Sequence, residues 1–123
     1  LATDTPDLLS TNSAIHLGKG PSIKILDAIR GKLASYVPDW ELTEFFRSIS
    51  EEHDLPLQVE ISPGISTALT PIPPSLPGGV KTAGLSIPIR YHHSPIETAH
   101  LNDVQTLIAI LDIFIKEFFQ SFK

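Results

Sequence analysis

The sequence predicts an α/β fold, a layered sheet with flanking helices. Two observations support this prediction: short segments with strand-like alternation recur along the chain, and two longer segments repeat apolar residues with helical spacing. Their order is strand, strand, helix, strand, loop or short helix, strand, helix, which is typical of layered α/β domains. At 123 residues the chain is one domain or part of one.

The predicted strands are short and are separated by turn-forming residues. They cover residues 1–5, 22–26, 55–61 and 80–89, and residues 97–101 are expected to add a short edge. Within residues 55–61 apolar and polar side chains alternate, which places them on opposite faces: Leu57, Val59 and Ile61 on one, Gln58 and Glu60 on the other.

Two amphipathic segments predict helices. The first begins after Pro38 with Asp39 as its N-cap, and it ends in the polar residues 51–54, which we interpret as a solvated helix end. The second begins at Asn102, with Gln105 three residues on, as in a capping box. Its apolar stripe is so broad that we expect burial on most of its circumference, against the sheet or at a subunit contact. Without the layers that cover it, such a helix would expose hydrophobic surface.

Two segments rich in glycine and proline are predicted to be irregular. Residues 17–21, Leu-Gly-Lys-Gly-Pro, form a turn that lacks the length and the Lys-Ser/Thr ending of a phosphate-binding loop, so we exclude a nucleotide site there. Residues 71–79 contain four prolines, which cannot continue a helix, and they predict an extended surface loop. A ligand for a proline-recognition domain is the alternative for this loop.

Composition excludes several classes of function. The formal net charge of −5 leaves no basic patch for nucleic-acid phosphates, and neither a run of about 18 apolar residues nor a signal peptide is present, so no membrane partner is expected. The chain has no cysteine, which excludes disulfides and thiolate metal sites and fits a reducing cytoplasm. Any metal would therefore be held by His, Asp or Glu. Because the chain starts without methionine, as if in the middle of a strand, we expect a C-terminal piece of a longer protein.

The candidate functional residues lie where the predicted strand at 80–89 gives way to a loop. His92 and His93 come there, followed by Ser-Pro-Ile and Glu97. A strand end that opens into a loop often carries ligands or catalytic groups. If the pair continues the strand, its side chains point to opposite faces, so at most one serves a site. A surface histidine and a hydrogen-bonded histidine are the alternative, and for Asp4, at another predicted strand end, the alternative is an Asx-type turn.

Four motifs, in the same order along the chain, resemble those of a known family. Arg90-Tyr-His-His-Ser-Pro-Ile-Glu97 is similar to its Arg-Tyr-x-His-Ser/Thr-Pro-x-Glu, and Leu101-Asn-Asp-Val104 to its Leu-x-Asp-Val. Leu17-Gly-Lys-Gly-Pro21 is similar to its Leu-Gly-x-Gly-Pro turn, and Leu1-Ala-Thr-Asp4 to a strand that carries a metal-binding aspartate. The chain thus resembles the tetrahedral (TET) aminopeptidases, also known as glutamyl aminopeptidases, deblocking aminopeptidases and cellulase-type endoglucanases.

The resemblance implies a co-catalytic metallopeptidase with two divalent metal ions, Zn or Co. By resemblance, His93 holds one metal and Asp4 the other; 93 minus 4 gives a separation of 89 residues, similar to that of the family, and His92 falls on a variable position. The general-base glutamate is expected upstream of Leu1, so no catalytic residue falls in this segment. The chain would be the C-terminal segment of an aminopeptidase that hydrolyses N-terminal residues of peptides.

The same resemblance implies the domain organisation and the partners. Residues 1–123 would form the C-terminal portion of a single catalytic domain with a zinc-exopeptidase-like (phosphorylase/hydrolase-like) fold, whose upstream part is absent. The implied partners are the peptide substrate, the remainder of the same polypeptide and further copies in a homo-oligomer.

Two departures from the family pattern keep an alternative open. Residues 63–69 lack the second glycine and the aspartate of the family's Gly-Gly-Thr-Asp segment, and the proline-rich residues 71–79 replace a helix. A diverged, non-catalytic homologue or a structural fragment of the same fold is therefore the alternative. Glycan hydrolysis, suggested by the cellulase label, would need two facing carboxylates that nothing in the sequence specifies.

Overall fold

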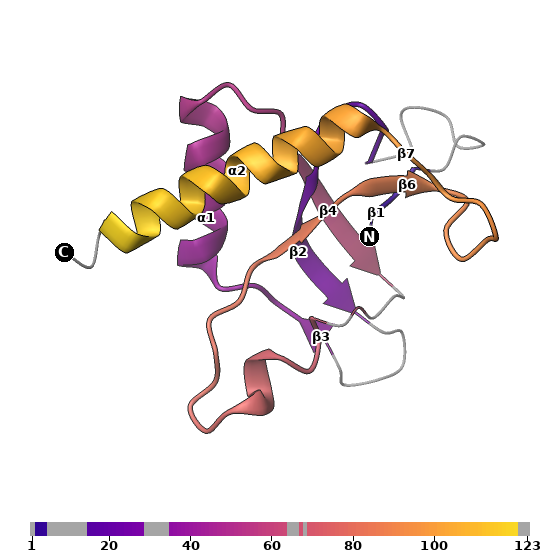
Figure 1. The fold of residues 1–123 in the computed structure, drawn as a ribbon. Helices are drawn as coiled ribbons and strands as arrows, with labels where there is room; N and C mark the ends of the chain where they lie inside the picture. The colour runs from indigo at the N-terminus through magenta and orange to yellow at the C-terminus, as the bar shows by residue number, and fades with distance from the viewer. Residues whose placement is uncertain (1, 5–14, 29–34, 64–66, 68, 121–123) are drawn as a thin grey trace.

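The computed structural model describes residues 2–4, 15–28, 35–63, 67 and 69–120. It combines strands with two helices, as an α/β fold requires (Figure 1). In chain order the elements are β1 (Ala2–Thr3), β2 (Ser22–Ala28), β3 (Ser35–Tyr36), α1 (Trp40–Glu52), β4 (Gln58–Pro63), a 3-10 turn (Pro73–Ser75), β5 (Gly84–Ser86), β6 (Pro88–Arg90), β7 (Thr98–Ala99) and α2 (Leu101–Gln120).

The described strands form two small sheets that share one continuous segment of chain. In the first, β2 pairs in parallel with β4 on one side and antiparallel with β3 and β5 on the other. In the second, β6 lies between β1, which runs parallel to it, and β7, which runs antiparallel. Because only Ile87 separates β5 from β6, the predicted strand at 80–89 passes from one sheet into the other.

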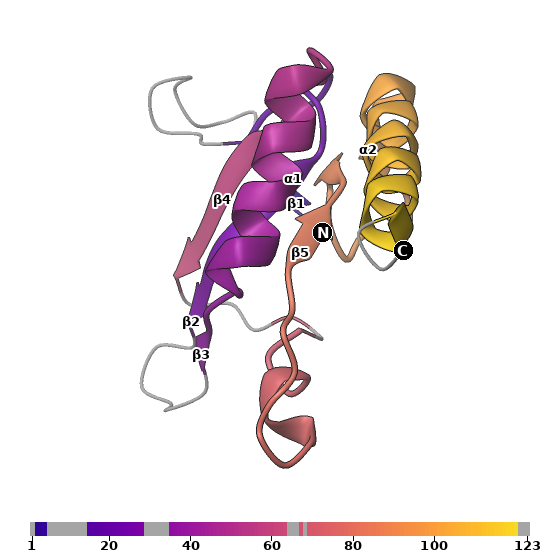
Figure 2. The same ribbon diagram turned by 90° about the vertical axis from the view of Figure 1, so that its left-hand side faces the viewer.

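Helix α1 packs against β2 and against α2, and in Figure 2 α1 lies over β4 and β2 while α2 lies beyond β5. The hydrophobic core joins the three elements through Ile23, Phe46, Ile49 and Ile110, all buried. Phe114 of α2 stacks on Phe46 of α1 with ring centroids 4.5 Å apart. The helices therefore bury one face of β2, which leaves the ends of β1 and β6 outside this core.

The start of α1 confirms its prediction from local sequence. Asp39 is the N-cap, and its carboxylate accepts a hydrogen bond from the Leu42 N–H at 3.0 Å. Lys81 donates a hydrogen bond to Glu41 and lies near Asp39. These carboxylates, Glu41 foremost, hold the pKa of Lys81 above its usual value of 10.5. The predicted solvated end is also confirmed, because residues 51–54 are exposed.

Strand β4 alternates as predicted, but it is the polar face that is buried. Val59 and Ile61 are 48% and 58% exposed, although Val59 lies opposite Ile23, which is buried in the core of β2 and the two helices. Glu60 is buried and accepts hydrogen bonds from Lys24 at 2.5 Å and from Ser22 at 2.9 Å. Lys24 lies directly opposite Glu60 in the parallel register, so the two charges neutralise each other inside the sheet.

Within the described chain α2 is not buried on most of its circumference, and its burial by further layers of the domain or at a subunit contact stays a prediction. Only Asp103 and Ile110 are buried, because α1 packs against one side of α2 alone. The opposite side exposes an apolar stripe of Ile108, Leu111, Ile115 and Phe119. This is the exposed surface expected of such a helix without its covering layers. No described helix combines the length and the apolarity that a bilayer crossing needs.

Two smaller expectations need correction. The proline-rich segment 71–79 is on the surface as predicted, but it contains a 3-10 turn at Pro73–Ser75, where proline occupies the first helical positions that need no N–H donor. The strand predicted over 80–89 begins only at Gly84. Residues 64–66 and 68, within the segment that departs from the family pattern, lie outside the described residues.

Candidate metal-binding loop and its supporting turn

The parallel pairing of β1 with β6 brings two predicted site regions to one edge of a sheet. Ala2 lies opposite Pro88 and Thr3 opposite Ile89. Parallel strands end at the same edge, so Asp4 follows β1 beside Arg90, the last residue of β6. The Asp4 N–H extends the ladder by donating to the Ile89 carbonyl at 2.9 Å. His93 lies three residues beyond Arg90, in the loop that leaves this edge.

The loop of residues 91–97 holds His93 on its exposed surface. Tyr91 and His93 have φ values of 61° and 63°, a left-handed conformation that is costly for residues other than glycine. Three hydrogen bonds hold the loop. The Ser94 N–H donates to the Tyr91 carbonyl at 3.0 Å, the His93 N–H donates to Glu97 Oε1 at 2.8 Å, and the Ser94 hydroxyl donates to the Ile96 carbonyl at 2.6 Å. The loop thus accepts local strain in order to present an imidazole to solvent.

The two histidines do not alternate across a strand. Strand β6 ends at Arg90, so both histidines lie in the turn after it, and the expectation of opposite faces for the pair is wrong. Their rings stack instead, with centroids 3.7 Å apart and an interplanar angle of 25°. Because of this stacking, His92 limits the directions in which the His93 ring can turn.

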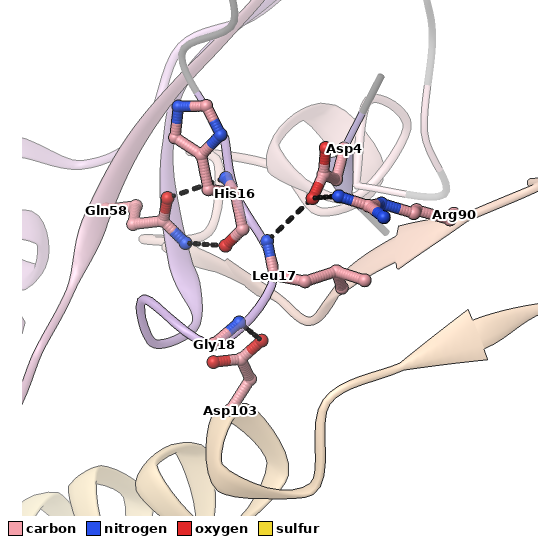
Figure 3. A network of polar contacts seen from close by, with 7 residues as sticks. All are labelled: Asp4, His16, Leu17, Gly18, Gln58, Arg90 and Asp103. Atoms are coloured by element: carbon pink, nitrogen blue, oxygen red, sulfur yellow. Dashed lines mark hydrogen bonds and ion pairs between the residues drawn. The ribbon is translucent and has the colours of Figure 1, made fainter. Parts of the chain in front are cut away.

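Asp4 lies in a different environment from His93. Its side chain is 4% exposed, and Oδ2 accepts two hydrogen bonds, from the Leu17 N–H at 2.9 Å and from Arg90 Nη2 at 3.1 Å. Figure 3 shows this carboxylate between the turn that carries Leu17 and the guanidinium of Arg90. Asp4 therefore connects three parts of the chain: the end of β1, the turn before β2 and the end of β6.

Two further side chains hold the turn of residues 15–21, which we call the supporting turn. Asp103, fully buried in the first turn of α2, accepts hydrogen bonds from the N–H groups of Gly18 and Gly20, each at 2.8 Å. The Gln58 amide of β4 accepts from the His16 N–H and donates to the His16 carbonyl, each at 2.9 Å (Figure 3). Side chains from β4, α2 and the residue after β1 thus hold one short turn.

Glycine is required at one position of the supporting turn for two separate reasons. Gly20 has φ of 90°, and a Cβ built on it would lie 2.1 Å from the carbonyl oxygen of Pro56. A contact that short involves backbone atoms, so no side-chain rotation relieves it. The second glycine of the Leu-Gly-x-Gly-Pro motif is therefore explained by close packing against the chain that enters β4.

The two predicted metal ligands fit a metal ion unequally. His93 presents an exposed imidazole on a hydrogen-bonded loop, which suits a Zn or Co ligand. The occupied Oδ2 of Asp4 fits a metal poorly. The guanidinium of Arg90, paired with this oxygen at 3.1 Å, would also repel a divalent cation bound there. Within the described residues no group of three or more His, Asp or Glu side chains could hold a metal ion. The assignment of Asp4 and His93 as ligands stays a prediction.

Sequence reasoning missed the roles of Arg90, Asp103 and Gln58. Arg90 and Asp103 both lie inside motifs that carry the family resemblance, so the signal for their importance was present. Their partners could not be read from it, because Asp103 bonds Gly18 across 85 residues and Arg90 bonds Asp4 across 86. Gln58 gave no signal beyond its place on the polar face of a strand.

The structure thus defines the class of protein. The chain is part of an α/β domain, and a loop that carries a histidine leaves the sheet at the edge where two parallel strands end. A sequence profile of the M42 glutamyl aminopeptidase family matches residues 1–110. The chain belongs to this family.

Similar proteins agree with this assignment. SgcX, a candidate aminopeptidase of Escherichia coli (strain K12), is 37% identical over 109 residues, which are 88% of this chain and 29% of SgcX. The aminopeptidase APDkam598 from the archaeon Desulfurococcus kamchatkensis is 32% identical with a TM-score of 0.83, over 94% of this chain and 31% of that one. The TET1 peptidase of Pyrococcus horikoshii, whose subunits can assemble into a tetrahedron or a large octahedral shell, is 27% identical with a TM-score of 0.63, over 89% of this chain and 29% of that one. The chain therefore spans less than a third of these relatives.

Proposed function

We propose that residues 1–123 are the C-terminal segment of a dinuclear metal-dependent aminopeptidase that removes N-terminal residues from peptides. Membership of the M42 glutamyl aminopeptidase family supports the reaction class. The structural observation that carries the proposal is the His93 imidazole, exposed on a hydrogen-bonded loop at the end of a parallel strand. The peptide substrate and the rest of the polypeptide, with a zinc-exopeptidase-like fold, belong to the same proposal.

His93 contributes to this reaction by holding one metal ion through its neutral imidazole. The chemistry that two bound divalent ions supply is polarisation of the scissile carbonyl and a lowered pKa of water. The hydrogen bond from the His93 N–H to Glu97 and the stacked ring of His92 fix where the imidazole lies. Since the general-base glutamate is expected upstream of Leu1, the 123-residue chain alone should not hydrolyse peptides.

A metal and activity assay on the full-length protein tests this proposal. The wild type should contain about two divalent ions per chain and release N-terminal residues from small peptide amides. His93→Ala should lose about one of the two ions and at least about 99% of the activity, because a metal ligand is removed. His53→Ala is the matched control: His53 is an exposed histidine at the end of α1, and its replacement should leave both quantities unchanged.

The opposite outcome would favour the alternative, a diverged homologue without catalytic activity. The altered segment 63–69 and the proline-rich residues 71–79 motivate this alternative. It predicts a folded full-length protein that binds no divalent ion and hydrolyses no peptide. A His93→Ala variant with the metal content and the activity of the wild type would also reject the assigned ligand.

We further propose that the complete protein forms a homo-oligomer in the cytoplasm. The assembly of TET1 supports the first part, and the apolar stripe of α2, Ile108 to Phe119, offers surface that needs a cover. The absence of cysteine from the sequence fits a reducing compartment. Analytical ultracentrifugation of the full-length protein would test the assembly, and a monomer at micromolar concentration would contradict it.

A further inference from the structure

We propose that Asp4 is a positioning residue: its carboxylate joins the supporting turn to Arg90 and thereby fixes the start of the loop that carries His93. It would act through Arg90 and would not hold a metal itself. The inference rests on the proposed function only where it names His93 as a metal ligand.

Arg90 is anchored by a single carboxylate. Among the described residues Asp4 is its only ion-pair partner, through Nη2 and Oδ2 at 3.1 Å. The Nε atom of Arg90 is buried and has no hydrogen-bond partner in the described part of the chain. The side chain is 37% exposed, so without Asp4 the guanidinium would be drawn out toward water. Asp4 is thus the group that holds Arg90 at the end of β6.

Asp4 itself is attached to a rigid part of the molecule. Its Oδ2 atom also accepts the Leu17 N–H, within the supporting turn. Asp103 and Gln58 fix the same turn from α2 and β4. A carboxylate that bonds a turn held by two other elements, α2 and β4, can transfer that rigidity to its second partner, Arg90.

The backbone beyond Arg90 is strained and depends on its surroundings. Tyr91 and His93 both have left-handed backbone, which persists only where neighbouring groups hold it. Hydrogen bonds at Ser94 and Glu97 hold the loop itself, and the anchored end of β6 at Arg90 holds the chain just before it. Loss of the Arg90 anchor would release one end of the loop, so that the imidazole of His93 would sample more directions.

The test compares Asp4→Asn, Arg90→Met and the double variant in the full-length protein. Asparagine can still accept the Leu17 N–H but loses the charge that pairs with Arg90, and methionine keeps an apolar stem without the guanidinium. Asp112→Asn is the matched control, because Asp112 is an exposed, ion-paired carboxylate on α2.

We expect peptides that cover residues 88–97 to exchange amide hydrogen about tenfold faster in both single variants, with kcat about tenfold lower and the metal content unchanged. The double variant should have the same exchange rates and the same kcat as either single variant, because all three variants break the same ion pair between Asp4 and Arg90. The control should match the wild type in every measurement.

Two outcomes would overturn the proposal. Loss of one metal ion in Asp4→Asn, with normal exchange in residues 88–97, would make Asp4 a ligand. Unchanged exchange in both single variants would show that the connection does not position the loop. The exchange measurement needs no metal, so it decides the proposal even if the His93→Ala assay rejects the proposed function.

Discussion

The supporting turn at 15–21 and the histidine loop at 91–97 both contain left-handed backbone, yet the molecule holds them in opposite ways. The turn uses glycine where φ is positive, at Gly18 and Gly20, and covers their N–H groups with the buried Asp103. The loop uses Tyr91 and His93 at its positive φ values and leaves both side chains exposed. The turn is therefore built for rigidity, and the loop accepts strain to expose an imidazole.

The largest expected effect comes from the close packing of the turn. Gly20→Ala should lower the free energy of unfolding by at least about 3 kcal/mol, because the new Cβ adds an unfavourable φ to a backbone clash. Gly78 in the proline-rich segment is a matched control, since its φ of 87° is similar but a Cβ there would meet nothing within 4 Å. Gly78→Ala should cost about 1 kcal/mol. Urea unfolding of the two variants measures the difference, and equal losses would contradict the packing argument.

The second largest loss of stability is expected on replacing Asp103, the buried residue of α2 whose carboxylate bonds the supporting turn. Asp103→Ala removes the acceptor for two backbone N–H groups, so it should lower the free energy of unfolding by about 2–4 kcal/mol. Asp112→Ala on the same helix removes only an exposed pair with Lys116 and should cost at most about 0.5 kcal/mol. Thermal unfolding can rank the two variants, and a small loss for Asp103→Ala would mean that the turn does not depend on it.

A glycine at Tyr91, the first residue of the loop with positive φ, should not destabilise the protein as the changes in the turn do. Tyr91→Gly relieves the cost of a positive φ at an exposed position, so it should raise the free energy of unfolding or leave it within about 1 kcal/mol of the wild type. Denaturant unfolding measures this change. A loss as large as that of Gly20→Ala would show that the loop is packed as tightly as the turn.

The smallest effect is expected at the hydrogen bond inside the loop. Glu97→Gln keeps an acceptor for the His93 N–H but weakens it, and at this exposed site the free energy of unfolding should change by at most about 0.5 kcal/mol. The local effect should be clearer, with faster amide exchange in residues 91–97 and unchanged exchange in residues 15–21. Equal changes in both segments would mean that the turn and the loop open together.

Local sequence predicted the elements that depend on local contacts. Helix α1 begins with the predicted N-cap Asp39, because a cap bonds an N–H only three residues away. Strand β2 was predicted from alternation, and the edge strand β7 lies within the residues expected to add a short edge. The alternation predicted for residues 55–61 holds only from Gln58, where β4 begins. The burial of Glu60 was not foreseen, since it depends on Lys24 in another strand.

The parts that the sequence could not predict depend on where strands end and on contacts between distant segments. The sequence did predict that α2 exposes apolar surface without its covering layers, but it did not predict that α1 packs against one side of α2. The stacked pair His92 and His93 results from the end of β6 at Arg90, which the run of apolar residues did not mark. For Asp4, the family resemblance predicted a metal ligand at a position where the structure places an ion pair with Arg90.

Anomalous scattering at the zinc edge from crystals of the full-length protein soaked in zinc tests the central claim most directly. The account predicts a strong peak about 2.1 Å from an imidazole nitrogen of His93 and no peak within bonding distance of Asp4, whose carboxylate stays paired with Arg90. A peak bonded to Asp4 with Arg90 turned away, or no peak at His93, would contradict it.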